Sequence, residues 1–333
     1  MRQGQGNGIG KGGIRLMAVL MVLVLALTAV GCGAKEEAAP GASGTTGGSE
    51  SSGPYTVKHA MGTTKIPATP KKVVILTNEG TEALLAMGIK PVGAVNSYVG
   101  DPWYPHIKDK MKDVTPLGKE DQPNLEAIAA LQPDLIIGNK MRQEKVYEQL
   151  SAIAPTVFSE TLRGDWKENF KLYAEALNRK AEGDKVMADF TANVNAFKEK
   201  AGDKLNTKVS VVRFMPGKIR IYYKDTFTGV LFKELGLKRP ASQDKEEFAA
   251  EVSKERVPEM DGDVLFYFTY DLGDGKGKQV EQELLNDPLW KNLPVVKNNK
   301  AFKVDDTIWN TSGGVLSANQ VIQELYQYLD IKK

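Results

Sequence analysis

Residues 73–95 read VVILTNEGTEALLAMGIKPVGAV, and this stretch decides the fold. It opens with four apolar residues, Val73 to Leu76, which favour a buried strand. A helical pattern from Glu79 to Met87 follows, and Gly88 closes it, as glycine commonly does after a helix. A second apolar run, Pro91 to Val95, predicts the next strand. The order of strand, helix and strand is the βαβ unit, so the sequence predicts an α/β fold.

Outward from this unit, the same alternation fills two segments of the chain. In the first, helices at 125–131 and 144–153 and strands at 134–138 and 156–159 complete an α/β lobe that is expected at residues 55–178. In the second, strands are expected at 208–215, 219–222, 263–270 and 301–304, with helices at 226–235, 280–285 and 317–330. These elements predict a second α/β lobe at residues 204–333.

Two helices are expected after the last strand of the first lobe, one that completes this lobe and one that links it to the second. The first follows Asp165, which resembles the start of a capping box because Glu168 stands three residues later. The second begins near Ala181, carries apolar residues at helical spacing and stops at Gly202. It is the expected linking helix at 179–203, and twenty helical residues span about 30 Å. The sequence therefore predicts two Rossmann-like α/β lobes joined by a single long helix, with a cleft of limited hinge motion.

The first 54 residues differ in composition from the rest. Lys11 and Arg15 precede an apolar run from Leu16 to Val30, the pattern of a secretory signal peptide, which is expected at residues 1–31. As a helix this run would span about 22 Å, less than the ~30 Å core of a membrane, so a permanent transmembrane helix is the weaker interpretation. The stretch 32–54 is rich in Gly, Ser and Thr and predicts a flexible tether.

Cys32 is the only cysteine of the chain, which excludes an intramolecular disulfide. The segment Ala29-Val30-Gly31-Cys32 resembles a bacterial lipobox, in which the cysteine is acylated and becomes the new amino terminus. It departs from the usual lipobox at Ala29, where leucine is common. An incidental thiol is the alternative. The resemblance implies a lipoprotein that is anchored to the extracytoplasmic face of the cell membrane by its acyl chains.

Composition disfavours several classes of function. The chain has 333 residues, 41% apolar and 26% charged, which is globular and large enough for two lobes. Of its 44 basic residues three lie in the first 31 positions, so the remainder carries 41 basic and 42 acidic residues, which gives no support to nucleic-acid binding. His59 and His106 are the only histidines, and common enzyme motifs are absent, so catalysis and a histidine-rich metal site are disfavoured. A lipid-anchored hydrolase and an adhesin stay open as alternatives.

Several segments carry a family resemblance through their order and spacing. They are NEGTEALLAMG at 78–88, PNLEAI at 123–128, PDLII at 133–137, PLW at 288–290 and DDTIW at 305–309. Over residues 55–333 the chain resembles the siderophore-binding members of the ABC-importer binding-protein family, which also includes cobalamin and haem carriers. NKMR at 139–142 and VVRFMPG at 211–217 are most similar to Gram-positive carriers of hydroxamate and citrate-based siderophores.

The resemblance implies a fold like that of class III periplasmic binding proteins, and a monomer that carries an iron(III)–siderophore complex between its lobes to the permease of an ABC importer. The siderophore oxygens hold the iron, so no protein metal ligand, cofactor or catalytic residue is expected. One acid per lobe, Glu82 and Glu234 by motif position, is implied to dock on the permease; exposed helix acids without a role are the alternative. A carrier of haem, cobalamin or another metal chelate is the alternative function.

Cationic side chains are the first candidates for contacts with such a ligand, because the fork of arginine pairs with a carboxylate through two parallel hydrogen bonds. Arg142 lies just beyond the expected strand 134–138, at the strand end where α/β sheets bind ligands. Arg213 lies on a strand that should be buried, where its charge needs a partner or a cleft. The other cationic candidates are Arg220, Lys140 and Arg163. For each of them a solvated charge or a structural ion pair is the alternative.

Aromatic side chains are the second group of candidates, because they offer flat apolar walls with a polar tip. Trp309 is expected in a loop after the last strand, facing the cleft. Tyr98 and Trp103 are expected in the loop after the strand at 91–95. Trp290 and Phe170 are expected to lie in the core instead.

Overall fold

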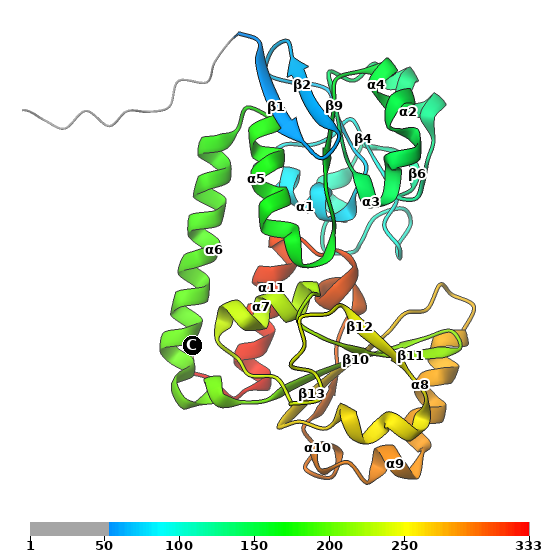
Figure 1. Cartoon of the computed structure of the whole chain (residues 1–333), viewed down its shortest axis with the longest axis vertical. Helices are drawn as coiled ribbons and strands as arrows, with labels where there is room; N and C mark the ends of the chain where they lie inside the picture. The colour runs from blue at the N-terminus through cyan, green and yellow to red at the C-terminus, as the bar shows by residue number, and fades with distance from the viewer. Residues whose placement is uncertain (1–52, 333) are drawn as a thin grey trace, which may run out of the picture. The chain divides into compact units, whose positions relative to one another are not determined.

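Two five-stranded sheets organise residues 53–332, the part of the chain that the computed structural model describes (Figure 1). The first sheet contains β3 (Val73–Ile75), β4 (Gly93–Ala94), β5 (Thr115–Pro116), β8 (Leu135–Asn139) and β9 (Thr156–Ser159). Its strand order is β5-β4-β3-β8-β9, and all neighbours are parallel.

The second sheet contains β10 (Val209–Met215), β11 (Lys218–Tyr222), β12 (Ala249–Val252), β13 (Val264–Thr269) and β14 (Ala301–Lys303). Its order is β12-β11-β10-β13-β14, with β10, β13 and β14 parallel and β11 and β12 antiparallel to their neighbours. Two small hairpins accompany the sheets: β1 (Tyr55–His59) with β2 (Gly62–Ile66), and β6 (Gly118–Lys119) with β7 (Gln122–Pro123). The predicted α/β class is confirmed.

The helices connect and cover these strands (Figure 1). They are α1 (Asn78–Ala86), α2 (Leu125–Leu131), α3 (Lys140–Gln143), α4 (Tyr147–Ile153), α5 (Trp166–Ala176), α6 (Lys180–Ala201), α7 (Phe227–Leu235), α8 (Lys276–Asn286), α9 (Pro288–Lys291), α10 (Pro294–Lys297) and α11 (Val315–Tyr328). Short 3₁₀ turns are η1 (Lys108–Met111), η2 (Glu144–Val146), η3 (Arg163–Asp165), η4 (Gly202–Asn206) and η5 (Lys254–Met260). A single π turn, η6 (Thr307–Thr311), follows β14.

The predicted βαβ unit at 73–95 is present, and local chemistry fixes its helix. All three residues of β3 are buried, as in parallel strands that are covered on both faces. The hydroxyl of Thr77 accepts a hydrogen bond from Gly80 N at 3.0 Å and caps α1. Gly88 adopts a φ of 76°, in the left-handed region that ends helices and that glycine enters without strain.

Helix α6 is the long helix that was expected between the two sheets. It runs for 22 residues without a break, and Phe190, Val194 and Phe197 form its buried stripe. It packs against α5, α7 and α11, so it contacts elements from both halves of the chain. The two sheets belong to one compact unit, and the expected domain limits at 55–178, 179–203 and 204–333 stay predictions.

Two local predictions are corrected. Asp165 precedes α5 as expected, but its carboxylate accepts a hydrogen bond from Thr161 Oγ1 instead of capping the helix. The loop expected around Trp309 is the π turn η6, which starts where Thr307 N donates to Asp305 Oδ1 at 2.8 Å. At the first place Thr161 takes up the carboxylate that was expected to cap the helix, and at the second the Asp305 side chain caps the first N–H group of the turn.

The predictions for the amino terminus fall on residues that the structure does not describe. They are the signal peptide at 1–31, the lipidated Cys32 and the tether as far as residue 52. Among residues 53–332, none of the helices combines the length and the apolar character needed to cross a membrane.

Candidate functional site

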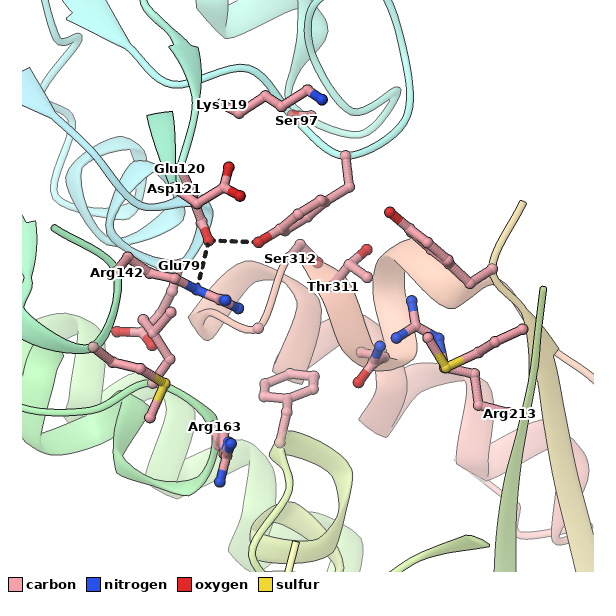
Figure 2. A pocket seen from close by; sticks show the side chains of 18 of the residues that line it. Glu79, Ser97, Lys119, Glu120, Asp121, Arg142, Arg163, Arg213, Thr311 and Ser312 are labelled. Atoms are coloured by element: carbon pink, nitrogen blue, oxygen red, sulfur yellow. Dashed lines mark hydrogen bonds and ion pairs between the residues drawn. The ribbon is translucent and has the colours of Figure 1, made fainter. Parts of the chain in front are cut away.

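A pocket of about 590 Å³ is lined by residues from both halves of the chain (Figure 2). The first half contributes Glu79, which follows β3, and residues 96–98, 119–121, 141–142 and 162–163, which follow the later strands. The second half contributes the end of β10, residues 270 and 272 after β13, and residues 310–313 after β14. These segments follow the carboxyl ends of strands, the edge at which open α/β sheets bind ligands.

Glu120 organises the wall that comes from the first half. Its Oε1 accepts hydrogen bonds from the backbone N and Nδ2 of Asn78, at 2.6 and 3.0 Å. Its Oε2 accepts from the Tyr98 hydroxyl at 2.7 Å and lies 3.6 Å from Arg142 Nε (Figure 2). Burial is the main cause, and the charge of Glu120 the second, that raise the pKa of Tyr98 well above its usual value. The phenol therefore stays a hydrogen-bond donor.

Arg142 and Tyr98 therefore both line the pocket, and their contact with a ligand stays a prediction. The Arg142 side chain is 41% exposed, and its long contact with Glu120 leaves most of its N–H groups without a protein partner in the described part of the chain. A guanidinium held on one side and open on the other can receive an anionic oxygen from a ligand.

Arg213 also lines the pocket, but its surroundings are buried. Its Nη2 pairs with Asp306 Oδ2 at 2.6 Å, and its Nη1 donates to the Tyr222 hydroxyl at 3.3 Å. The guanidinium lies over the ring of Tyr270, 4.6 Å from the centroid, and its Nε has no hydrogen-bond partner. The ion pair that was the alternative interpretation is present, and Arg213 also lines the pocket, so its contact with a ligand stays a prediction.

Arg220 and Arg163 complete the cationic lining around one aromatic ring. Arg220 donates from Nε and Nη2 to Glu251 Oε1, at 3.1 and 2.7 Å. Arg163 lies over the face of Phe248, with its guanidinium carbon 4.2 Å from the ring centroid. Phe248 was not predicted, because it lies in an irregular segment before β12 and has no periodic pattern that could reveal it.

Positive charge exceeds negative charge in the pocket. The basic lining residues are Lys119, Arg142, Arg163, Arg213 and Arg220, and the acidic ones are Glu79, Glu120 and Asp121. Burial, with help from the nearby carboxylates, raises the pKa of Glu79 to about 8 against the opposing hydrogen bond from Asn169. Glu79 is therefore mostly protonated at neutral pH and offsets little of the charge of the arginines.

Three ligand candidates do not line the pocket. Trp309 is fully buried; it packs against Phe266 at a centroid distance of 4.4 Å and donates from Nε1 to Glu324 Oε2 at 2.6 Å. Trp103 is 6% exposed and belongs to the same core cluster. Lys140 points elsewhere and pairs with Glu160 at 2.8 Å. Large apolar surfaces are most stabilising when buried, so the two tryptophans serve the core.

The two docking candidates differ in exposure. Glu82 is fully buried, with hydrogen bonds to Ser317 and His106. The docking role implied by its motif position requires a carboxylate on the surface, and the structure does not place one there. Glu234 on α7 retains 23% side-chain exposure and pairs with Lys167 of α5 at 2.7 Å. Trp290 and Phe170 lie in the core, as predicted.

Sequence reasoning also missed Tyr270, Glu120 and residues 310–313. Tyr270 closes a strand that was predicted, so its place at a carboxyl end was a usable signal. Glu120 and Thr311 lie in short turns, where sequence carries no comparable signal. In the described residues no group of three His, Cys, Asp or Glu side chains is arranged to hold a metal ion.

The fold and the pocket together define a class: a binding protein in which two α/β halves, with one long helix between them, enclose a cationic pocket. The chain belongs to the periplasmic binding protein family, whose model matches residues 73–307. Members of this class are solute-binding proteins rather than enzymes.

Individual relatives cover nearly the whole chain. The probable siderophore-binding lipoprotein YfiY of Bacillus subtilis is 50% identical over 324 residues, covering 95% of this chain and 97% of its own. The Fe(3+)-citrate-binding protein YfmC of the same organism is 30% identical, with 94% and 98% covered. Among solved structures, Staphylococcus aureus SirA complexed with staphyloferrin B superposes with a TM-score of 0.78 at 37% identity, covering 84% of this chain and 99% of that one.

Proposed function

We propose that this chain binds an iron(III)–siderophore complex in the pocket and delivers it to an ABC importer. The observation that carries the proposal is a pocket with a surplus of arginines and no cluster of metal-ligating side chains in the described residues. Such a lining suits a ligand whose iron is already enclosed by its own anionic oxygens. The names of the relatives YfiY, YfmC and SirA support the same ligand class.

The ligand subclass follows from the chemistry of the lining. Carboxylate and hydroxamate oxygens are acceptors, and arginine donates to them in pairs, with charge-assisted bonds roughly twice as strong as neutral ones. Phe248 and Tyr270 offer apolar faces for the carbon skeleton of the ligand. We therefore assign a citrate-based or hydroxamate siderophore as the ligand.

Titration of the purified protein tests the assignment. Ferric hydroxamate, ferric citrate-type, ferric catecholate, haem and cobalamin are added while tryptophan fluorescence is followed. Saturable quenching by a ferric hydroxamate or citrate-type complex is the expected result. Binding of haem or cobalamin alone, or of no ferric complex at all, would overturn it.

Delivery and anchoring belong to the same proposal. Acylated Cys32 holds the monomer at the extracytoplasmic face of the cell membrane, and Glu234 contacts the permease. Replacing Cys32 by serine removes the acceptor of the lipid, so the wild type is expected to incorporate radiolabelled palmitate and the variant Cys32→Ser is not. Equal incorporation by the two proteins would contradict lipidation at this residue.

A further inference from the structure

Helix α11 begins without a cap of its own. Its N-cap position is Gly314, which has no side chain to accept a hydrogen bond from the first turn. The first N–H groups of a helix lack partners inside the helix, and leaving them unpaired in a buried place is costly. The missing acceptor has to come from elsewhere in the molecule.

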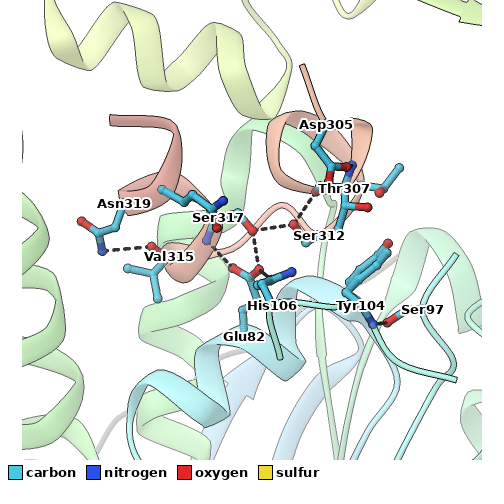
Figure 3. A network of polar contacts seen from close by, with 12 residues as sticks. Glu82, Ser97, Tyr104, His106, Asp305, Thr307, Ser312, Val315, Ser317 and Asn319 are labelled. Carbon is cyan, nitrogen blue, oxygen red and sulfur yellow. Dashed lines mark hydrogen bonds and ion pairs between the residues drawn. The ribbon is translucent and has the colours of Figure 1, made fainter. Parts of the chain in front are cut away.

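Glu82 of α1 supplies that acceptor from 235 residues away in the sequence (Figure 3). Its Oε2 accepts from Ser317 N at 2.9 Å, and its Oε1 accepts from the Ser317 hydroxyl. A carboxylate at this place also interacts favourably with the positive end of the helix dipole. Glu82 therefore caps a helix that follows the second sheet, although its own helix follows the first strand of the first sheet.

Gly314 is required for this contact. A Cβ at this position would lie 2.7 Å from the Cβ and 2.7 Å from Oε2 of Glu82, and 3.1 Å from the Glu79 carbonyl oxygen. Backbone and side chain of α1 leave no room for it. The two halves of the chain therefore meet at a point where one added methyl group would separate them.

His106 gives the buried carboxylate a further partner. Its Nε2 lies 2.6 Å from Glu82 Oε1, and the Glu82 side chain is fully buried while that of His106 is 15% exposed. A buried carboxylate is tolerated only when several donors surround it. The N–H and hydroxyl groups of Ser317, together with His106, surround the Glu82 carboxylate with hydrogen-bond partners.

The network extends from Glu82 to the pocket. Ser312 Oγ lies 2.5 Å from Ser317 Oγ and 2.5 Å from the Thr307 carbonyl oxygen. The proton of Ser317 goes to Glu82, so the single proton of the Ser312 hydroxyl is shared between the Thr307 carbonyl oxygen and the Ser317 hydroxyl oxygen. Residues 310–313, which include Ser312, line the pocket.

We propose that Glu82 is a positioning residue for ligand binding: by capping α11 and holding Ser317 and Ser312, it fixes residues 310–313 as part of the pocket wall. This inference rests on the proposed function for the identity of the ligand. It assigns Glu82 a role inside the molecule, in place of the docking role that its motif position implies.

Amide hydrogen exchange, measured without ligand, tests the cap. In Glu82→Ala, the amides of residues 312–318 are expected to exchange roughly tenfold faster, the change that about 1.4 kcal/mol of lost stabilisation gives. Glu126→Ala removes an exposed acid from the first turn of α2 and is the matched control, with no change expected at 312–318. Unchanged exchange in Glu82→Ala would overturn the proposal whether or not a siderophore binds.

Affinity tests the link to the pocket. The ferric complex that binds the wild type most tightly in the titration is the probe, with ferric citrate and ferric staphyloferrin B as the first two. Glu82→Ala is expected to raise its Kd at least tenfold, and Glu82→Gln, which keeps an acceptor for Ser317 N, is expected to recover part of the loss. Faster exchange with an unchanged Kd would overturn the positioning role.

Two further variants separate positioning from a general loss of stability. Val257→Ala, in the core of the second half and outside the pocket, lowers the Tm and is expected to leave Kd unchanged. Ser317→Ala, outside the pocket, keeps the backbone cap on Glu82 but removes the hydroxyl between Glu82 and Ser312, so it should raise Kd by itself even if Glu82→Ala fails to fold. A Kd in Ser317→Ala equal to that of the wild type would count against the proposal.

Discussion

Arg142 and Arg213 show how one residue type takes two roles in the same pocket. Arg142 is 41% exposed and touches Glu120 only at 3.6 Å, whereas Arg213 is buried and pairs with Asp306 at 2.6 Å. Removing a loosely held charge costs the fold little, whereas removing one partner of a buried pair leaves the other charge unsatisfied. The two arginines should therefore separate affinity from stability.

Arg142→Ala is expected to weaken binding of the ferric siderophore by about 1–3 kcal/mol, because one charged hydrogen bond to the ligand is lost. Its free energy of unfolding should change by less than about 1 kcal/mol. Fluorescence titration and urea denaturation measure the two quantities. For comparison, Arg213→Ala should lose about 3–5 kcal/mol of stability. Wild-type affinity in Arg142→Ala would remove this residue from the site.

Glu79 gives the stability a pH dependence of known sign. Its pKa is raised from 4.5 to about 8, chiefly by burial, so between these values the folded state holds a proton that the unfolded state has released. Its contribution to stability is complete below about pH 4.5 and is lost as the pH rises to about 8. With about 1.4 kcal/mol for each pKa unit, the loss is on the order of 5 kcal/mol.

Glu79→Gln is expected to remove this slope, because the amide keeps the shape of the neutral acid and does not ionise. Urea denaturation of both proteins at several pH values between 5 and 8.5 gives the difference curve, in which other titrating groups cancel. The stability of the wild type should fall relative to the variant across the range. A flat difference would mean that Glu79 ionises normally.

Short elements and their ends account for most differences between expectation and structure. The helices and strands with strong periodicity, such as α1, α6 and β10, lie within a few residues of their predicted positions. The π turn η6 was expected as a loop, so Trp309 was expected to face the cleft. A five-residue turn has too few positions for a periodic pattern to reveal which of its side chains are buried. In η6 the Trp309 side chain points into the core.

Trp309→Phe tests the corrected position of Trp309. Phenylalanine keeps aromatic packing against Phe266 but loses the hydrogen bond to Glu324, so the free energy of unfolding should fall by about 1–3 kcal/mol. The Kd for the ferric siderophore should not change, because the ring does not line the pocket. Denaturation and fluorescence titration check both parts; weaker binding by a fully folded variant would show that Trp309 supports ligand binding, directly or through residues 310–313.

At the scale of the whole molecule, we expect α6 to limit how far the two sheets move relative to each other. It is one continuous helix that packs on α5, α7 and α11, and bending it would disturb those contacts. Ligand addition is therefore expected to leave the radius of gyration unchanged within error in small-angle scattering. A decrease of several ångströms would contradict the prediction.

A variant of α6 provides the control for that measurement. Ala188→Gly combined with Asp189→Gly changes two exposed positions in the middle of the helix, at a cost of about 1 kcal/mol each. If helix stiffness limits the motion, ligand addition should produce a larger compaction in this variant than in the wild type. Equal responses would place the restraint in the packing of the halves instead.

The sequence by itself determined the order of strands and helices, the long helix between two α/β halves, and the arginines that follow or end strands. These features are recorded locally, because the alternation of apolar and polar residues reflects burial along each element. The sequence also indicated that Tyr98 lies near the ligand edge of the first sheet, since loops at the carboxyl ends of parallel strands share one edge of a sheet.

Only the tertiary structure decided which of these residues meet. Glu82 and Ser317 are 235 positions apart, and Phe248 joins Arg163 and Arg220 from a segment without any pattern. Whether a tryptophan fills the core or a carboxylate is enclosed depends on what packs against it from distant parts of the chain. A linear pattern does not contain that information, because burial in a loop is set by neighbours in space and not by neighbours in sequence.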